Sequence, residues 1–132
     1  MGENRIKLVA ADMDGTLLNR ERKITKYTQN VIKKAMAQGV YFVPATGRAV
    51  NALPPELKEM EGIRYGIFSN GATIYDLKEE KVIYKNHFEM DRVLELMDFL
   101  KQFDLMESIS LNGQSYACLL YTSPSPRDKR QS

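Results

Sequence analysis

The sequence predicts an α/β fold built on a parallel sheet, followed by the start of a second α/β module. Strand-like and helix-like segments alternate over residues 5–70 in the order β-α-β-α-β, which is typical of parallel strands joined by right-handed crossovers. A polar cluster follows each of the three expected strands, and these clusters are Asp12 to Thr16, Thr46 to Arg48, and Ser69 to Gly71. From residue 72 the pattern changes to a hairpin, a helix and a further strand.

The first expected strand is the apolar run from Ile6 to Ala11, with Lys7 near its start. A run of this kind favours a parallel strand that is largely buried. Residues 12–24 contain Gly15 and a polar set from Asn19 to Lys23. We therefore expect a loop between this strand and the next element.

Thr25 is expected to cap a helix that runs through Ala37, because threonine is a favoured N-cap residue. Gly39 marks the C-terminal end of this helix. The apolar residues of this helix recur at helical spacing: Val31, Ile32, Ala35 and Met36. A second strand, residues 40–45, follows the helix.

A second helix is expected between residues 49 and 60, and its prolines at 54 and 55 favour a start near Pro55. The third strand is residues 65–70. Two short alternating runs, residues 72–76 and 82–86, indicate a hairpin.

The remaining segment predicts a helix capped by Asp91 and a strand from Met106 to Leu111. Asn112-Gly113 is a turn signal that follows this strand. The apolar residues of the helix are Val93, Leu96, Met97, Leu100 and Phe103. These elements resemble the start of a separate α/β module.

Two carboxylates, Asp12 and Asp14, stand one residue apart where the first strand ends. Like charges this close repel each other, and a divalent cation such as Mg²⁺, which prefers oxygen ligands, would stabilise them. One carboxylate can attack phosphorus, and a second can protonate the leaving oxygen and later activate water. Ligands bind beyond the carboxyl ends of parallel strands. The residues therefore permit a magnesium-dependent phosphoryl-transfer site.

The polar clusters also offer groups that suit a phosphate. Gly15 allows a sharp turn and close approach of the backbone to a ligand. Thr16 and Thr46 offer hydroxyls. Each cluster also has a plainer interpretation as solvated loop, strand-to-helix turn or reverse turn, and Arg48 could simply be a solvated residue. The position of all three clusters after expected strands favours the site.

Three motifs resemble those of the haloacid dehalogenase-like (HAD) hydrolases. Residues 12–18, DMDGTLL, are similar to the first motif of that superfamily, DxDGTL. Residues 45–48, ATGR, and residues 69–72, SNGA, resemble segments of its Cof-like sugar-phosphatase subgroup. The likeness covers most of residues 5–117. It implies a Rossmann-like parallel sheet core in residues 1–85, of which only the N-terminal part is present, followed by the start of an α/β cap domain in residues 86–117.

The resemblance also implies roles for these residues in a phosphatase of small phosphorylated metabolites. Asp12 would be the nucleophile and a Mg²⁺ ligand. Asp14 would be the acid/base, with its backbone carbonyl on the metal. Thr46 would hydrogen-bond the phosphoryl group. The other residues expected to bind substrate are Gly15, Thr16, Gly47, Arg48, Asn70 and Gly71.

The family's lysine motif and its distal aspartates lie after the cap, and neither can be placed in this sequence. The chain is therefore expected to be truncated, with weak metal binding and almost no turnover. Truncation would leave the strand at residues 6–11 with an open apolar edge, so we expect an insoluble or partly folded fragment.

The C-terminal segment, residues 118–132, is expected to be a non-native tail. Its first part, CLLYTSPSPRD from Cys118 to Asp128, resembles the translation of a transposase sequencing-library adapter. Without this segment the basic residues fall from 19 to 16 and the acidic residues from 17 to 16, so the net charge falls from +2 to zero. A disordered native tail is the plainer interpretation.

Composition excludes several other classes of protein. The chain is 43% apolar and 27% charged, and no apolar run approaches a membrane span. One cysteine and one histidine exclude a disulfide and a multi-histidine metal site. We expect a cytoplasmic protein with no nucleic-acid or membrane partner, and the sequence leaves its oligomeric state open. A phosphomutase of the same superfamily and a non-catalytic phospho-ligand module remain as alternative functions.

Overall fold

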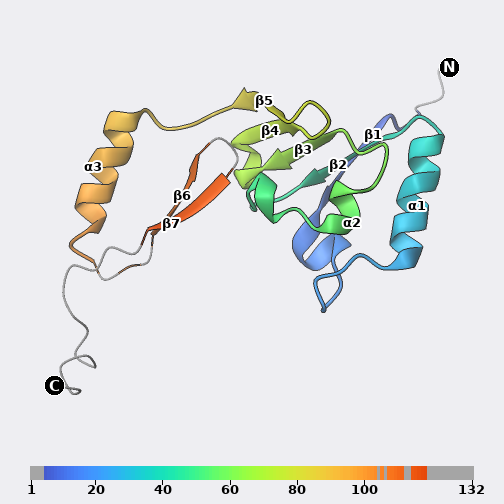
Figure 1. Ribbon diagram of the computed structural model, residues 1–132, viewed down its shortest axis with the longest axis horizontal. Helices are drawn as coiled ribbons and strands as arrows, with labels where there is room; N and C mark the ends of the chain where they lie inside the picture. Colours follow the sequence, from blue (N-terminus) through green and yellow to red (C-terminus); the bar gives the residue numbers. More distant parts are fainter. Residues whose placement is uncertain (1–4, 104, 106, 112–113, 119–132) are drawn as a thin grey trace.

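The computed structural model describes residues 5–103, 105, 107–111 and 114–118. Figure 1 shows a five-stranded sheet with α1 and α2 beside it, and a separate two-stranded sheet that lies between α3 and the larger sheet. The order of elements along the chain confirms an α/β fold.

The larger sheet has the order β1-β2-β3-β4-β5. Its first three strands, β1 (Leu8–Asp12), β2 (Tyr41–Ala45) and β3 (Tyr65–Phe68), run parallel. The other two, β4 (Thr73–Asp76) and β5 (Lys81–Lys85), form an antiparallel hairpin against β3. The parallel strands and the hairpin were both predicted from the sequence, and both predictions are confirmed.

The first helix, α1 (Lys26–Ala37), begins and ends as predicted. The Thr25 hydroxyl accepts a hydrogen bond from the Thr28 amide at 3.2 Å, which satisfies one amide of the first turn. Gly39 follows the helix with a φ of 84°, a conformation that glycine adopts without strain. Ile32 is buried on the side of the helix that faces the core.

The expected second helix is much shorter than predicted. A 3₁₀ turn at Val50–Ala52 comes first, and α2 (Pro55–Lys58) follows it. Pro54 and Pro55 interrupt the segment because proline lacks an amide hydrogen and restricts the residue before it. The predicted start at Pro55 is confirmed, whereas the predicted extent to Met60 is wrong.

One hydrophobic core lies between the larger sheet and the segments that follow β1, β2 and α2. The side chains of Phe68, Met13 and Leu57 are fully buried in it. A Cβ on Gly66 would come within 2.5 Å of the Phe68 ring, so a side chain at this position would displace the ring. The other buried members of the cluster are Leu18, Ile24, Ile32, Phe42, Leu53, Met60 and Ile63.

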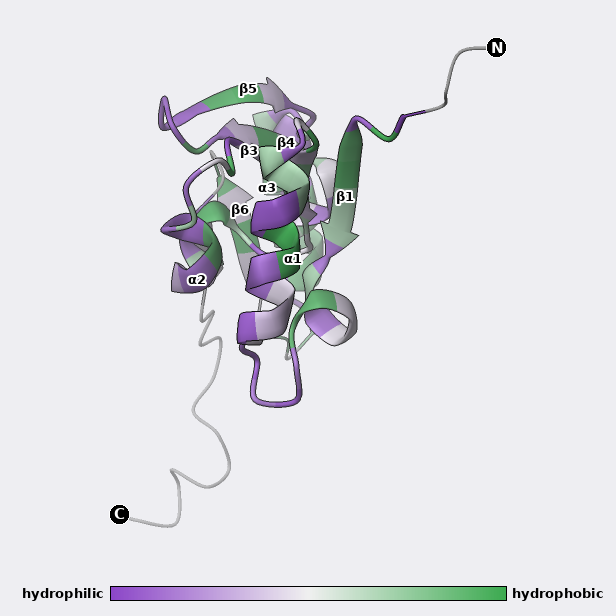
Figure 2. Ribbon diagram, turned by 90° about the vertical axis from the view of Figure 1, so that its right-hand side faces the viewer, coloured by the Kyte–Doolittle hydropathy of each residue, from purple (hydrophilic) through white to green (hydrophobic). Residues whose placement is uncertain are grey.

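The prediction that the first strand is largely buried is wrong. Strand β1 pairs with β2 alone among the described residues, so it forms an edge of the sheet. Leu8 and Val9 remain 55% and 38% exposed, and Ile6 just before the strand is 71% exposed. Figure 2 shows β1 as a hydrophobic strand at the margin of the fold. The predicted open apolar edge is therefore confirmed.

The second module consists of α3 (Met90–Leu100) and a hairpin of β6 (Glu107–Leu111) and β7 (Gln114–Cys118). The N-cap residue of α3 is Glu89, which makes no side-chain capping bond, so the prediction of Asp91 as cap is wrong. Strand β7 was not predicted, and it includes Cys118, the first residue of the expected tail. Met106, the turn signal Asn112-Gly113 and residues 119–132 lie outside the described residues.

Helix α3 carries exposed apolar side chains. Leu94, Leu96 and Phe99 are each at least half exposed, and Val93 and Met97 are half-buried. The predicted apolar spacing is present, but it does not bury a full face of the helix.

An ion pair that was not predicted from the sequence links the hairpin to the residue that precedes β3. The Arg64 guanidinium contacts the Asp76 carboxylate at 3.1 Å, and the Asp76 side chain is only 3% exposed. The amides of Lys78 and Glu79 also donate to this carboxylate, each at 3.0 Å. The Glu79 amide lowers the pKa of Asp76, Arg64 and the Lys78 amide act in the same direction, and desolvation opposes them.

The Asp76→Ala variant should lower the melting temperature at pH 7 by about 5 °C or more, because buried donors lose their acceptor. The folded-state pKa of Asp76 is depressed, so its contribution is present at neutral pH and is lost as the pH falls below about 4. Thermal unfolding followed by circular dichroism at pH 7 and pH 3 measures both effects.

The matched control is Asp98→Ala, which removes an exposed pair with Lys101 and should change the melting temperature little. An equal loss of stability in the Asp76 and Asp98 variants would contradict the structural role of Asp76.

Candidate active site

The three polar clusters meet at one edge of the sheet. In the parallel register Asp12 lies opposite Ala45, and Ala45 lies opposite Ile67. The residues that follow these positions are therefore neighbours across the sheet. The arrangement predicted from the sequence, with one cluster at the carboxyl end of each parallel strand, is present.

A single wide turn, Met13–Leu17, follows β1. The Leu18 amide donates to the Met13 carbonyl at 2.9 Å and closes the turn. Met13 is fully buried, whereas Asp12 and Asp14 on either side of it are exposed. Gly15 has a φ of 79°, a conformation that favours glycine. Burial of Met13 thus leaves both carboxylates outside the core.

Asp14 forms a bidentate ion pair with Arg48. The Arg48 Nε donates to Asp14 Oδ2 at 2.9 Å, and Nη2 donates to Oδ1 at 2.5 Å. This pairing lowers the pKa of Asp14, with a smaller contribution from Arg22, while desolvation acts against it. The pKa of Arg48 is raised by the same contact. Asp14 is therefore held as a carboxylate.

Asp12 has a different environment from Asp14. Its Oδ2 accepts a hydrogen bond from the Thr16 hydroxyl at 3.2 Å. None of the ion pairs formed within the described ranges involves Asp12. The two acids thus differ in their partners, because the Asp14 carboxylate pairs with the Arg48 guanidinium and the Asp12 carboxylate accepts from the Thr16 hydroxyl.

Thr46 is buried and joins the second and third clusters. Its hydroxyl oxygen accepts from the Arg48 amide at 3.1 Å. A hydroxyl that accepts in this way keeps its own hydrogen to donate to another acceptor. The Thr46 carbonyl accepts from the Asn70 amide at 3.2 Å, and the Arg48 carbonyl accepts from the Ser69 amide at 3.0 Å.

Gly47 and Asn70 lie in close contact. A Cβ on Gly47 would come within 2.8 Å of Asn70 Oδ1, so no other residue fits there unless Asn70 moves. Asn70 and Gly71 have φ values of 55° and 91°, which asparagine and glycine tolerate better than most residues. No atom lies within 4 Å of the corresponding Cβ position on Gly71.

The oxygen donors at this edge fit a magnesium ion. Magnesium binds through one or two carboxylates and keeps several waters. The Asp12 carboxylate can serve as such a ligand, because no cation partner occupies it. The Asp14 side chain holds Arg48 instead, so only its backbone carbonyl is left for the predicted metal role. No group of three acidic, histidine or cysteine side chains suited to a metal occurs among the residues that the structure describes.

The sequence did not indicate the pairing of Arg48 with Asp14. Arg48 was expected to shape the phosphate end of the site or to be solvated, and its partner lies 34 positions away in the chain. Only the strand register brings the two side chains together. The repulsion between Asp12 and Asp14 is thus offset in part by an arginine of the chain itself.

Comparisons with known proteins agree with the motifs. Residues 9–131 match the model of the haloacid dehalogenase-like hydrolase family. A putative phosphatase of Buchnera aphidicola subsp. Schizaphis graminum is 39% identical over 83% of this chain. The 5-amino-6-(5-phospho-D-ribitylamino)uracil phosphatase of Bacillus subtilis is 37% identical over 64% of the chain. The structure of a sugar phosphatase of HAD subclass IIB is similar with a TM-score of 0.71, at 27% identity over 95% of the chain.

The chain spans less than half the length of these relatives. It covers 40% of the Buchnera protein, 36% of the Bacillus protein and 47% of the subclass IIB sugar phosphatase. None of the helices in the described part of the chain is long and apolar enough to cross a membrane.

The Arg48→Gln variant should raise the pKa of Asp14 toward the ordinary value of an aspartate, because the main cause of its depression is removed. Carbon-13 NMR titration of the side-chain carboxyl group measures this change. The Arg22→Gln variant is the control and should raise the pKa of Asp14 less, since Arg22 acts only at a distance. An unchanged Asp14 titration in Arg48→Gln would contradict the ion pair.

Proposed function

This chain belongs to the haloacid dehalogenase-like hydrolases. We propose that the site formed by the turns after β1, β2 and β3, called the strand-end site below, is the phosphoryl-transfer end of a magnesium-dependent phosphatase. The proposed substrates are small phosphorylated metabolites, and the proposed intermediate is an aspartyl-phosphate on Asp12. The observation that carries the proposal is the different pairing of two adjacent acids, Asp12 with a hydroxyl and Asp14 with a guanidinium.

Asp12 is the proposed nucleophile. Its carboxylate is exposed and forms no ion pair with any residue that the structure describes, so one oxygen can attack phosphorus while the bond from phosphorus to the ester oxygen breaks. Water then attacks the same phosphorus and releases Asp12 and inorganic phosphate. The Thr46 hydroxyl, which keeps its hydrogen, would donate to a phosphoryl oxygen. A bound magnesium ion would neutralise charge on the phosphoryl group and on Asp12.

Asp14 is the proposed acid and base. An acid must first carry a proton, and the Arg48 ion pair holds Asp14 as a carboxylate instead. An incoming phosphoryl group offers Arg48 a second anionic partner. Transfer of the guanidinium from Asp14 to that group would raise the pKa of Asp14 and allow it to protonate the leaving oxygen. Arg48 would in this way couple substrate binding to the protonation of Asp14.

The substrate class rests on the relatives. The name of the Bacillus protein describes a phosphorylated ribityl compound, and the subclass IIB protein is called a sugar phosphatase. Both names describe phosphate esters of small metabolites. We propose that residues 86–117 begin a cap that selects among such compounds, that residues 118–132 are a non-native tail, and that the protein acts in the cytoplasm.

We further propose that this chain is inactive alone, since the family's lysine and distal aspartate motifs have no counterpart in it. Hydrolysis of p-nitrophenyl phosphate with magnesium chloride should stay near the buffer background. The full-length Buchnera relative, assayed beside it, provides the reference rate. A rate for this chain close to that reference would contradict the requirement for the missing motifs.

Magnesium should still bind weakly at Asp12. Titration with magnesium chloride should shift the amide NMR signals of residues 12–16, and Asp12→Asn should weaken the binding by about tenfold or more. The control is Asp98→Asn, which removes an exposed acid of α3 and should leave the titration unchanged. Equal binding by the Asp12→Asn variant would overturn the assignment of Asp12 as a ligand.

A further inference from the structure

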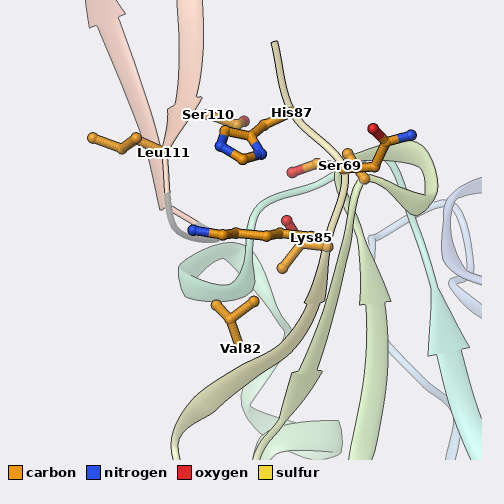
Figure 3. A pocket seen from close by; sticks show the side chains of 9 residues that line it. Ser69, Val82, Lys85, His87, Ser110 and Leu111 are labelled. Carbon is orange, nitrogen blue, oxygen red and sulfur yellow. The ribbon is translucent and has the colours of Figure 1, made fainter. Parts of the chain in front are cut away.

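We propose that the cavity between the end of β5 and the end of β6 is a second anion site, which takes a phosphate-sized oxyanion. The cavity has a volume of about 70 Å³. Figure 3 shows Lys85 and His87 reaching into it from the β5 side and Ser110 and Leu111 bordering it from β6. Ser69 and Val82 also line the cavity.

The charge of the lining favours an anion. Lys85 and His87 are its ionisable side chains, and no carboxylate lines the cavity. Neither side chain forms a hydrogen bond or ion pair with any other residue that the structure describes. The Lys85 ammonium group provides a charge-assisted donor for an oxyanion, and the His87 imidazole offers a further N–H donor beside it.

Ser69 supplies a further donor. Its hydroxyl oxygen is buried and has no hydrogen-bond partner within the described structure. Leaving a buried hydroxyl without a partner costs about 1–3 kcal/mol, so such a group calls for a bound water or ion. Figure 3 shows the Ser69 hydroxyl directed toward the space beside His87. The Ser69 amide donates to the Arg48 carbonyl, which fixes the position of this residue.

The volume sets the size of the ligand. One water needs roughly 10–15 Å³ of this kind of space, so a cavity of about 70 Å³ holds several waters or one tetrahedral oxyanion. It is too small for a whole nucleotide or sugar phosphate. The ligand that fits is a free phosphate ion or the phosphate group of a metabolite whose remainder lies outside.

This site is separate from the strand-end site. Asp12, Asp14 and Thr46 do not line the cavity. The turn that follows β3 borders both sites, because Ser69 faces the cavity while Asn70 contacts Gly47. The inference does not depend on the proposed phosphatase activity.

Titration with inorganic phosphate and, separately, with glycerol 3-phosphate tests the proposal, and the lower of the two dissociation constants identifies the free ion or the ester group as the preferred ligand. The amide NMR signals of Ser69, Lys85, His87 and Ser110 should shift with either ligand at constant ionic strength. The titration is performed in the Asp12→Asn background as well, where the shifts at the cavity should persist.

The Lys85→Gln variant should weaken this binding by about three- to tenfold, and Lys85→Arg should retain it because the charge is kept. Lys81→Gln is the matched control, since Lys81 lies at the other end of β5 and does not line the cavity. The proposal is overturned if neither ligand shifts the signals of the cavity residues. It is also overturned if Lys85→Gln and Lys81→Gln bind equally well.

Discussion

The parallel register of β1, β2 and β3 is the constraint on which the site depends. Asp12 lies opposite Ala45 and Ala45 lies opposite Ile67, so the turns after β1, β2 and β3 begin side by side. Every contact between the clusters follows from this alignment, including the Asp14–Arg48 ion pair and the contact between Gly47 and Asn70. A slip of one residue would place Asp12 on the other face of the sheet and separate these groups.

The acids at the end of β1 are stabilised first by the protein itself. Arg48 pairs with Asp14 and offsets part of the repulsion between the two carboxylates, which leaves Asp12 for other partners. The pair also sets the protonation of Asp14, because the guanidinium favours the charged carboxylate. Preorganised charge of this kind suits the phosphoryl-transfer role that we propose for this site.

Strand β1 and helix α3 are among the elements that expose apolar side chains. Among the strands that the structure describes, β1 has a partner on one side only, and α3 leaves Leu94 and Phe99 more than half exposed. An unpaired edge with apolar side chains is a surface that other strands can join. The buried core, by contrast, lies around Met13, Leu57 and Phe68, and two of these residues directly adjoin the turns of the site.

The sequence by itself determined the order of the elements, the Thr25 cap, the hairpin and the placement of the polar clusters after the strands, because these depend on local spacing and on residue type. The predicted burial of the first strand and the predicted length of the second helix were wrong. Strand β1 was predicted to be buried but lies at an edge, since burial depends on neighbours that an apolar run does not specify. Only the tertiary structure decided the pairing of Arg48 with Asp14 and of Arg64 with Asp76, and the cavity at Lys85. Each of these joins residues distant in the chain, and strand register and packing, rather than residue type, bring such groups within contact distance.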